Sequence, residues 1–309
     1  MSEIFQLLFG LVILLIGGEF LVRGSITFAK FLKVSPLVIG LTVVSFGTSA
    51  PELLVSLQAA LNGSPDLAVG NIIGSNIANL ALVLGLTVLI LPMVVDKSSL
   101  FFNWLVMIMA TLLFCVFSIT NQKIVFWEGL ILFSSLLVYL LYFFFNSNKI
   151  VSHSDIDTNK NNKIWLALIY FVSGSVGLYY GAKVLVSSAE IIAIDVLGIS
   201  EAVVGSTIVA FGTSLPELVA SCVAAFKKQS GISIGNLIGS NIFNLLAVIG
   251  VTSIITPVSV YESFIQFDFY WLIIISIIIG PVLLFFKKVG RVIGSFLVLF
   301  YIAYILFLL

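Results

Sequence analysis

The sequence predicts an all-α, polytopic membrane protein with ten transmembrane helices, arranged as two inverted five-helix repeats. Three observations carry this prediction. Of the 309 residues, 61% are hydrophobic and 9% are charged, whereas a typical soluble domain has about 25% charged residues. The apolar stretches are long enough to cross a bilayer, which takes roughly 20 residues of helix. A block of the first half also recurs in the second half.

The composition excludes several classes of protein. A chain with a mean hydropathy of +1.24 lacks the polar residues needed to cover a water-facing surface, so soluble enzymes and disordered proteins are excluded. Fourteen basic and fourteen acidic residues cancel, which leaves no electrostatic field for binding nucleic acid. The expected surroundings are therefore the lipid bilayer, and nothing in the composition requires more than a monomer.

Ten apolar stretches alternate with short polar breaks along the chain. They indicate helices, because they are long and continuous and lack the ~10-residue alternating segments of a membrane barrel. The predicted spans are residues 4–26, 35–60, 67–92, 99–120, 124–146, 164–190, 200–226, 231–257, 265–286 and 290–309.

The longest polar stretch divides these spans into two sets of five. We expect a first five-helix repeat over 1–146, a cytoplasmic linker over 147–163, and a second, inverted repeat over 164–309. Twelve of the fourteen basic residues fall in loops on one side of the membrane, and only Lys123 and Lys183 do not. Since loops rich in Lys and Arg stay in the cytoplasm, we expect a cell-membrane protein with both termini outside.

The repeat is visible in the residues themselves. At an offset of 165 residues, the block 40–92 overlays 205–257 without a gap, and about half of the aligned residues are identical. An odd number of spans per half means that the second copy enters the membrane upside down. Inverted repeats are typical of secondary transporters, whose binding site lies near the midplane where the repeats meet.

Two acidic residues lie in the middle of the repeated block. Glu52 and Glu217 occupy matching positions within apolar spans, and no Lys or Arg occurs at the same depth in either copy. A charged carboxylate at the centre of a span costs roughly 2.5–3.5 kcal/mol. The missing positive charge is most simply supplied by a bound cation or a proton.

Oxygen-bearing residues surround each glutamate. Gly47 and Pro51 should interrupt the helix, which would free the carbonyls from Ser45 to Thr48 to turn toward a cation. Helical spacing places further oxygens on shared faces, namely Thr48, Ser49 and Glu52, then Ser75 and Asn79, and in the second copy Thr213, Ser214, Glu217, Ser240 and Asn244. Calcium prefers about 6–8 such oxygen ligands, and the absence of His and Cys from the set argues against zinc or copper.

Structural roles compete with ligand roles for some of these residues. The pairs Ser49/Glu52 and Ser214/Glu217 each fit a capping box at a helix start, although capping explains no membrane-buried charge. Two pairs of glycines with GxxxG spacing are better explained by helix packing, and four asparagines could serve interhelical hydrogen bonding as well as ligation. Glu19 has no counterpart in the second half, which favours an accessory or structural role. These residues are Gly70, Gly74, Gly235, Gly239, Asn71, Asn76, Asn236, Asn241 and Glu19.

The two blocks resemble the α-repeats of the cation/calcium exchanger superfamily, and the size of the chain resembles its prokaryotic sodium/calcium exchangers. The most specific likeness is in Gly47-Thr48-Ser49-x-Pro51-Glu52 with Gly74-Ser75-Asn76, and in the copies 212–217 and 239–241. The resemblance implies antiport of Ca²⁺ against Na⁺ by alternating access, without a cofactor and without enzymatic activity.

The resemblance also implies roles for individual residues. Glu52 and Glu217 would be the central Ca²⁺ ligands, helped by the carbonyls of Thr48 and Thr213 and completed by Asn79 and Asn244. The flanking Na⁺ sites would use Thr48, Ser49 and Ser75 on one side, and Ala210, Thr213, Ser214 and Ser240 on the other.

Several alternatives stay open at this level. Some relatives carry aspartate where this chain has Asn244, so dependence on K⁺ is in doubt for this chain. A Ca²⁺/H⁺ antiporter could use the same glutamates, although the proton-coupled branch carries acidic residues where this chain has Ser75 and Ser240. A passive channel is disfavoured by the inverted repeat. An intramembrane hydrolase is disfavoured because Ser49 and Ser214 have no basic residue at their depth.

Overall fold

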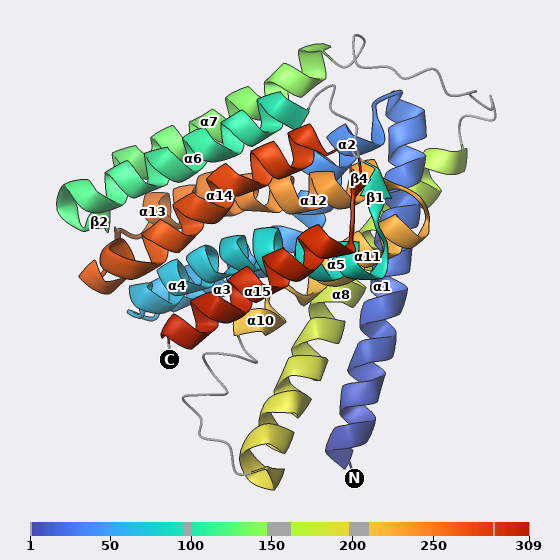
Figure 1. Ribbon diagram of the computed structural model, residues 1–309, viewed down its shortest axis with the longest axis horizontal. Helices are drawn as coiled ribbons and strands as arrows, with labels where there is room; N and C mark the ends of the chain where they lie inside the picture. The colour runs from blue at the N-terminus through green and yellow to red at the C-terminus, as the bar shows by residue number, and fades with distance from the viewer. Residues whose placement is uncertain (1, 95–99, 147–161, 198–209, 287, 309) are drawn as a thin grey trace.

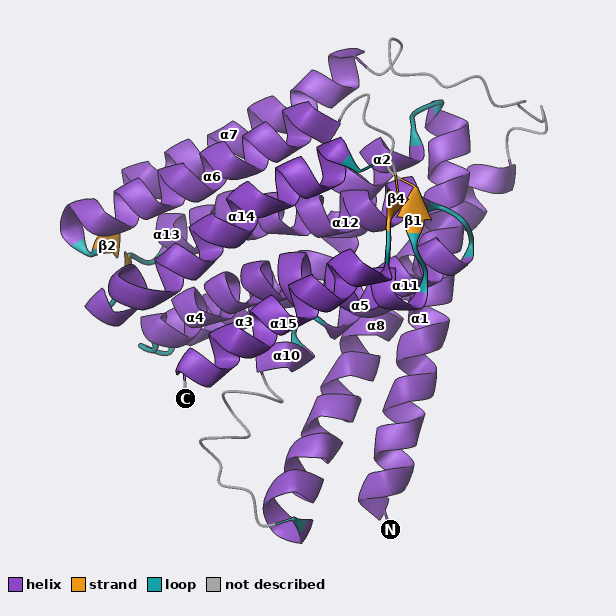
Figure 2. Cartoon of the chain, viewed as in Figure 1, coloured by secondary structure: helices purple, strands orange, loops and turns teal. Residues whose placement is uncertain are grey.

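The computed structural model describes residues 2–94, 100–146, 162–197, 210–286 and 288–308. Almost all of these residues are helical, with two short two-stranded ribbons at the periphery (Figure 2). The predicted helical membrane protein is confirmed. Nine helices in the described ranges are long and apolar enough to cross a membrane, and the shorter apolar helix Leu215–Phe226 lies in the predicted seventh span. Positions 200–209 of that span, and most of the predicted linker, fall outside the described residues.

The first half contains seven helical segments and two short strands before the break at 147–161. Several spans combine a regular helix with a π-helical stretch (η). The elements are α1 (Ser2–Leu32), α2 (Pro36–Ile39), η1 (Gly40–Val44), α3 (Ser45–Leu61), α4 (Pro65–Ile77), η2 (Ala78–Val83), α5 (Leu84–Ile90), β1 (Met93–Val94), α6 (Leu100–Asn121), β2 (Lys123–Ile124) and α7 (Phe126–Asn146).

The second half repeats this order where it is described. Its elements are α8 (Asn162–Ile191), η4 (Ile192–Val196), α10 (Ala210–Gly212), α11 (Leu215–Phe226), α12 (Ser230–Phe243), η6 (Asn244–Val248), α13 (Ile249–Ile255), β3 (Val258–Ser259), η7 (Phe264–Asp268), α14 (Phe269–Phe285), β4 (Lys288–Val289) and α15 (Arg291–Leu308). Strand β1 pairs with β4, and β2 pairs with β3, each antiparallel. Both ribbons therefore join the two halves to each other.

The first helices of the two halves pack against each other and run in opposite directions. A Cβ added at Gly10 would meet Gly181 and Leu185, whereas one added at Gly24 would meet Ala167 and Phe171. Because contacts at one end of α1 fall at the other end of α8, the pair is antiparallel, as inverted halves require. In Figure 1 this pair crosses the other long helices at a steep angle.

The helix interruption predicted at the glutamates occurs in one half only. In the second half, α10 ends at Gly212 and α11 begins at Leu215, directly before Pro216. In the first half, α3 continues through Pro51, and the irregular stretch lies earlier, in η1. The prediction of a break at 47–52 is wrong there, because Pro51 removes only the hydrogen bond to the Gly47 carbonyl and the helix tolerates that loss.

Two hydrophobic cores flank the centre of the molecule. The larger core joins α4–α7 to α12–α15, and the smaller one lies where α1 and α8 meet α11. The four segments that carry the repeated block, α3, α4, α11 and α12, pack against one another between these cores. Their polar side chains are thereby removed from both lipid and bulk water.

Candidate functional site

Both glutamates of the repeated block are fully buried. Glu52 on α3 and Glu217 on α11 are each 0% exposed, and their carboxyl groups are close enough to interact. The Ser49 hydroxyl donates to Oε1 of Glu217 at 3.3 Å, and the Ser240 hydroxyl donates to the same atom at 3.4 Å. Residues of both halves therefore converge on one pair of carboxylates, as the sequence predicts.

Threonine and serine hydroxyls form a matched pair of contacts between the halves. Thr48 Oγ1 lies 3.3 Å from Ser240 Oγ, and Ser75 Oγ lies 3.3 Å from Thr213 Oγ1. Adding 165 to the first member of one contact gives the second member of the other. The site thus has the two-fold relation expected of inverted repeats.

Four asparagines form a second matched pair. Asn79 donates through Nδ2 to Oδ1 of Asn241 at 3.4 Å, and Asn244 donates through Nδ2 to Oδ1 of Asn76 at 3.1 Å. The Oδ1 atoms of Asn79 and Asn244 are buried and accept no hydrogen bond from the described residues. The amide groups are therefore oriented so that their donors are used and their oxygens remain available.

Further buried oxygens share this condition. Within the described ranges, both carboxylate oxygens of Glu52, Oε2 of Glu217 and Oγ of Ser214 also have no hydrogen-bond partner. Leaving a polar atom unpaired away from water costs free energy. Both ion pairs found in the described part of the chain involve Glu19, so no Lys or Arg neutralises the site. A cation bound by oxygen atoms would satisfy these groups together.

The two ligands predicted from backbone position lie at helix starts. Ser45 is the first residue of α3 and Ala210 is the first residue of α10. The Ser45 hydroxyl is already engaged, because it donates to the carbonyls of Gly40 at 2.7 Å and Asn236 at 3.1 Å. Any contribution of Ser45 to a cation site would therefore come from its carbonyl group.

Two asparagines that sequence reasoning left open have a structural role. Asn71 donates to the Ser56 hydroxyl at 2.9 Å, and Asn236 donates to the Ser221 hydroxyl at 3.1 Å. These matched bonds tie α4 to α3 and α12 to α11. Sequence reasoning missed the two serines as partners, although both are identical at the same offset within the repeated block. Asn236 also accepts a hydrogen bond from Thr48 at 3.0 Å, so it positions a site residue.

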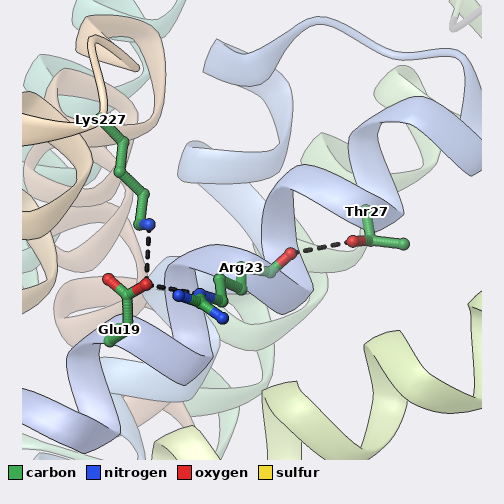
Figure 3. A network of polar contacts seen from close by, with 4 residues as sticks. All are labelled: Glu19, Arg23, Thr27 and Lys227. Atoms are coloured by element: carbon green, nitrogen blue, oxygen red, sulfur yellow. Dashed lines mark hydrogen bonds and ion pairs between the residues drawn. The ribbon is translucent and has the colours of Figure 1, made fainter.

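Glu19 is held by two basic side chains outside this cluster. Its Oε1 accepts from Arg23 Nε one turn along α1 and from Lys227 Nζ, just beyond α11, at 2.7 Å (Figure 3). The carboxylate is only partly buried. The structural role favoured from the sequence agrees with this arrangement, in which Glu19 ties α1 to the end of α11.

Comparisons with known proteins agree over nearly the whole chain. A sequence model of the family described as sodium/calcium exchanger protein matches residues 2–145 and 166–309. The sodium/calcium exchanger MaX1 of Methanosarcina acetivorans is 32% identical over 340 residues, which cover 98% of this chain and 97% of MaX1. An uncharacterized membrane protein of Methanocaldococcus jannaschii, MJ0091, is 38% identical over 80% of both chains. The structure of the sodium-calcium exchanger NCX_Mj soaked with Na⁺ and Ca²⁺ superimposes with a TM-score of 0.85 and 33% identity, covering 99% of this chain and 98% of NCX_Mj.

Proposed function

This chain belongs to the sodium/calcium exchanger protein family, and we propose that it is a secondary antiporter that exchanges Ca²⁺ for Na⁺ by alternating access. The observation that carries the proposal is the cluster of buried oxygens without donors, contributed by both halves around Glu52 and Glu217. Membrane-buried carboxylates without a basic partner mark ion pathways. The membership supports a transporter rather than an enzyme.

The proposed ligands divide into a centre and two flanks. The centre consists of Glu52, Glu217, Asn79 and Asn244, with the backbone carbonyls of Thr48 and Thr213. The flanking oxygens come from Ser45, Ser49, Ser75, Ala210, Ser214 and Ser240. The matched contacts between Thr48 and Ser240 and between Ser75 and Thr213 support equivalent flanks on the two sides of the centre.

Charge balance favours exchange at one shared site. Two ionised glutamates give the centre a charge of −2, which one Ca²⁺, two Na⁺ or two protons would neutralise. A third Na⁺ would leave the loaded site positive and make transport electrogenic. Mg²⁺ should fit badly, because it is smaller and loses its water reluctantly.

The proposed orientation follows from the loop charges. We place both termini outside the cell membrane and the linker over 147–163 in the cytoplasm, because basic residues concentrate on that side. The two halves, 1–146 and 164–309, would then present the shared site to opposite sides of the membrane in turn.

Proton coupling is the second candidate. The oxygens of Glu52 and Glu217 that lack donors could bind protons as well as Na⁺, and the family membership fits either driving ion. The choice between them is made by measuring ⁴⁵Ca uptake into proteoliposomes loaded in turn with Na⁺, with K⁺ or with a proton gradient. We expect an outward Na⁺ gradient alone to drive uptake. Uptake that requires the proton gradient would instead identify a Ca²⁺/H⁺ antiporter, and uptake without any countertransport would identify a channel.

Acid should inhibit transport by competition. Protons and Ca²⁺ bind to the same carboxylate oxygens, so Na⁺-driven Ca²⁺ uptake should fall as the pH drops, and raising Ca²⁺ should partly restore it. The measurement is the initial rate of ⁴⁵Ca uptake over a grid of pH and Ca²⁺ concentrations. Inhibition of equal depth at low and high Ca²⁺ would contradict a shared site.

Asn244→Asp and Asn79→Asp should each make transport more dependent on pH. Either substitution places a third carboxylate beside Glu52 and Glu217, and three crowded carboxylates cannot all be ionised without further cations. One of them should therefore hold a proton over part of the neutral range. The same Na⁺-driven flux assay across pH, with and without K⁺, compares both variants with the wild type.

The conserved geometry of the amide also provides a control for this prediction. Asn71→Asp adds a carboxylate on the same helix as the centre but next to Ser56, so it should leave the pH profile of transport nearer to that of the wild type. Unchanged profiles in both Asn244→Asp and Asn79→Asp would show that these asparagines do not border the carboxylate pair.

A further inference from the structure

Asp268 is a buried carboxylate that the proposed exchange site does not use. It lies where η7 meets α14 and is 5% exposed, and with Glu52 and Glu217 it makes up the acidic side chains that are buried within the described ranges. Its Oδ1 accepts a hydrogen bond from the hydroxyl of Tyr304 on α15 at 2.7 Å. No basic side chain pairs with it in the described part of the chain. An ionised carboxylate inside a span is costly, so this position calls for an explanation.

The other half shows that the hydrogen bond itself does not require a carboxylate. At the offset of 165 residues, Asp268 corresponds to Asn103 and Tyr304 corresponds to Tyr139. The Tyr139 hydroxyl donates to Oδ1 of Asn103 at 2.9 Å, and this pair is also buried. A neutral amide therefore holds the tyrosine equally well. What Asp268 adds in the second half is a group that can gain and lose a proton.

A cavity adjoins Asp268 on the side of α4. It has a volume of about 140 Å³ and is lined by Asp268, Tyr301, Tyr304, Phe264, Gly70 and Gly74, with Ile305 and Leu308. A volume of this size admits a few water molecules, each of which occupies about 30 Å³ in the liquid. The lining side chains offer one carboxylate and two phenolic hydroxyls, which is too few oxygens for Ca²⁺. The site therefore suits a proton better than a metal ion.

Charged groups on the surrounding helices do not compete for this role. The titratable side chains that face Asp268 across the cavity are Tyr301 and Tyr304 of α15, and α4 contributes glycines there. Asp66 lies in the exposed first turn of α4, and Arg291 starts α15, thirteen residues before Tyr304, which is about 20 Å along a helix. Helix α6, which also packs against α14, has no acidic or basic residue between Leu100 and Asn121.

We propose that Asp268 is a proton-binding site within the membrane, separate from the pair Glu52 and Glu217. Its carboxyl group exchanges a proton with water in the cavity, and Tyr304 holds it in place in both states. The cavity touches Gly74, next to Ser75 on α4, so the charge on Asp268 acts on the helix that leads to Asn79. Protonation there would change the transport rate without displacing Ca²⁺ from its ligands.

The test detects the proton directly and does not depend on transport. The background is the purified full-length double variant Glu52→Gln/Glu217→Gln, which removes the other buried carboxyls. Infrared difference spectra recorded across the neutral pH range should show the C=O band of a protonated carboxyl that disappears as the pH rises. Adding Asp268→Asn should abolish the band, and Tyr304→Phe should shift it while keeping its pH dependence, because the hydrogen bond is lost but the proton is not.

Asp268→Asn is well matched as a control, since Asn103 already shows that an amide fits this position. Its melting temperature in detergent should therefore stay near that of the background protein. A band that is absent at every pH would overturn the proposal, and so would a band that never titrates. A titrating band would support it whichever ion drives Ca²⁺ transport, so the failure of this proposal and that of the proposed function are distinguishable.

Discussion

Glu52→Gln and Glu217→Gln should each abolish Ca²⁺ transport while leaving the protein folded. Each substitution keeps the size of a fully buried side chain but removes one of the two negative charges that would balance Ca²⁺. With no basic residue near by to take over the charge balance, the remaining carboxylate and the neutral oxygens should not hold a divalent cation. We expect ⁴⁵Ca uptake at the level of empty liposomes for both variants.

The control for this experiment is a glutamate away from the site. Glu262→Gln changes an exposed residue whose carboxylate bonds only to Gln266 among the contacts described, so transport should stay near that of the wild type. Gel filtration of each variant in detergent shows whether it remains folded. A folded Glu52→Gln or Glu217→Gln variant with substantial uptake would remove that glutamate from the centre.

Gly174→Val should prevent assembly of the folded protein. A Cβ at this position would collide with the backbone of Leu21 on α1, and backbone atoms cannot move aside as a flexible side chain can. Overpacking in a well-packed core costs about 1–3 kcal/mol, and here it would act on the contact that joins the first helices of the two halves. The expected result is a large loss of monodisperse protein and of transport.

Val172→Leu is the matched control on the same helix. Its side chain is 51% exposed, on a surface that lipid would cover, so added bulk there should be tolerated. The yield of monodisperse protein and its melting temperature compare the two variants. Wild-type yield for Gly174→Val would mean that α1 and α8 do not pack as closely as the structure has them.

The helical class, the repeat and the central glutamates could be predicted because each leaves a signal along the chain. Long apolar stretches determine the spans, and a fixed offset of 165 residues relates the two copies. Charge inside an apolar span marks Glu52 and Glu217 without reference to the fold. The hydroxyl and amide oxygens around them follow from helical spacing, and the structure brings both copies together.

Other features depend on contacts that no local pattern encodes. The continuity of α3 through Pro51 reflects packing on its neighbours, so a local rule for proline predicted a break that does not occur. The partners of Glu19 could not be predicted, because Lys227 is 208 residues away in sequence. The carboxylate of Asp268 escaped notice for a related reason. It lies outside the repeated block, and only its contact with Tyr304 shows that its counterpart is Asn103.

The contacts between the halves have a consequence for the synthesis of this protein in the cell. Thr48, Ser75, Asn76 and Asn79 all find hydrogen-bond partners beyond residue 212. A ribosome that has completed only the first five spans has therefore placed polar side chains and Glu52 in the bilayer without their partners. The nascent first half should be a short-lived species that membrane chaperones shield and proteases remove, and it reaches stability only when the second half is inserted.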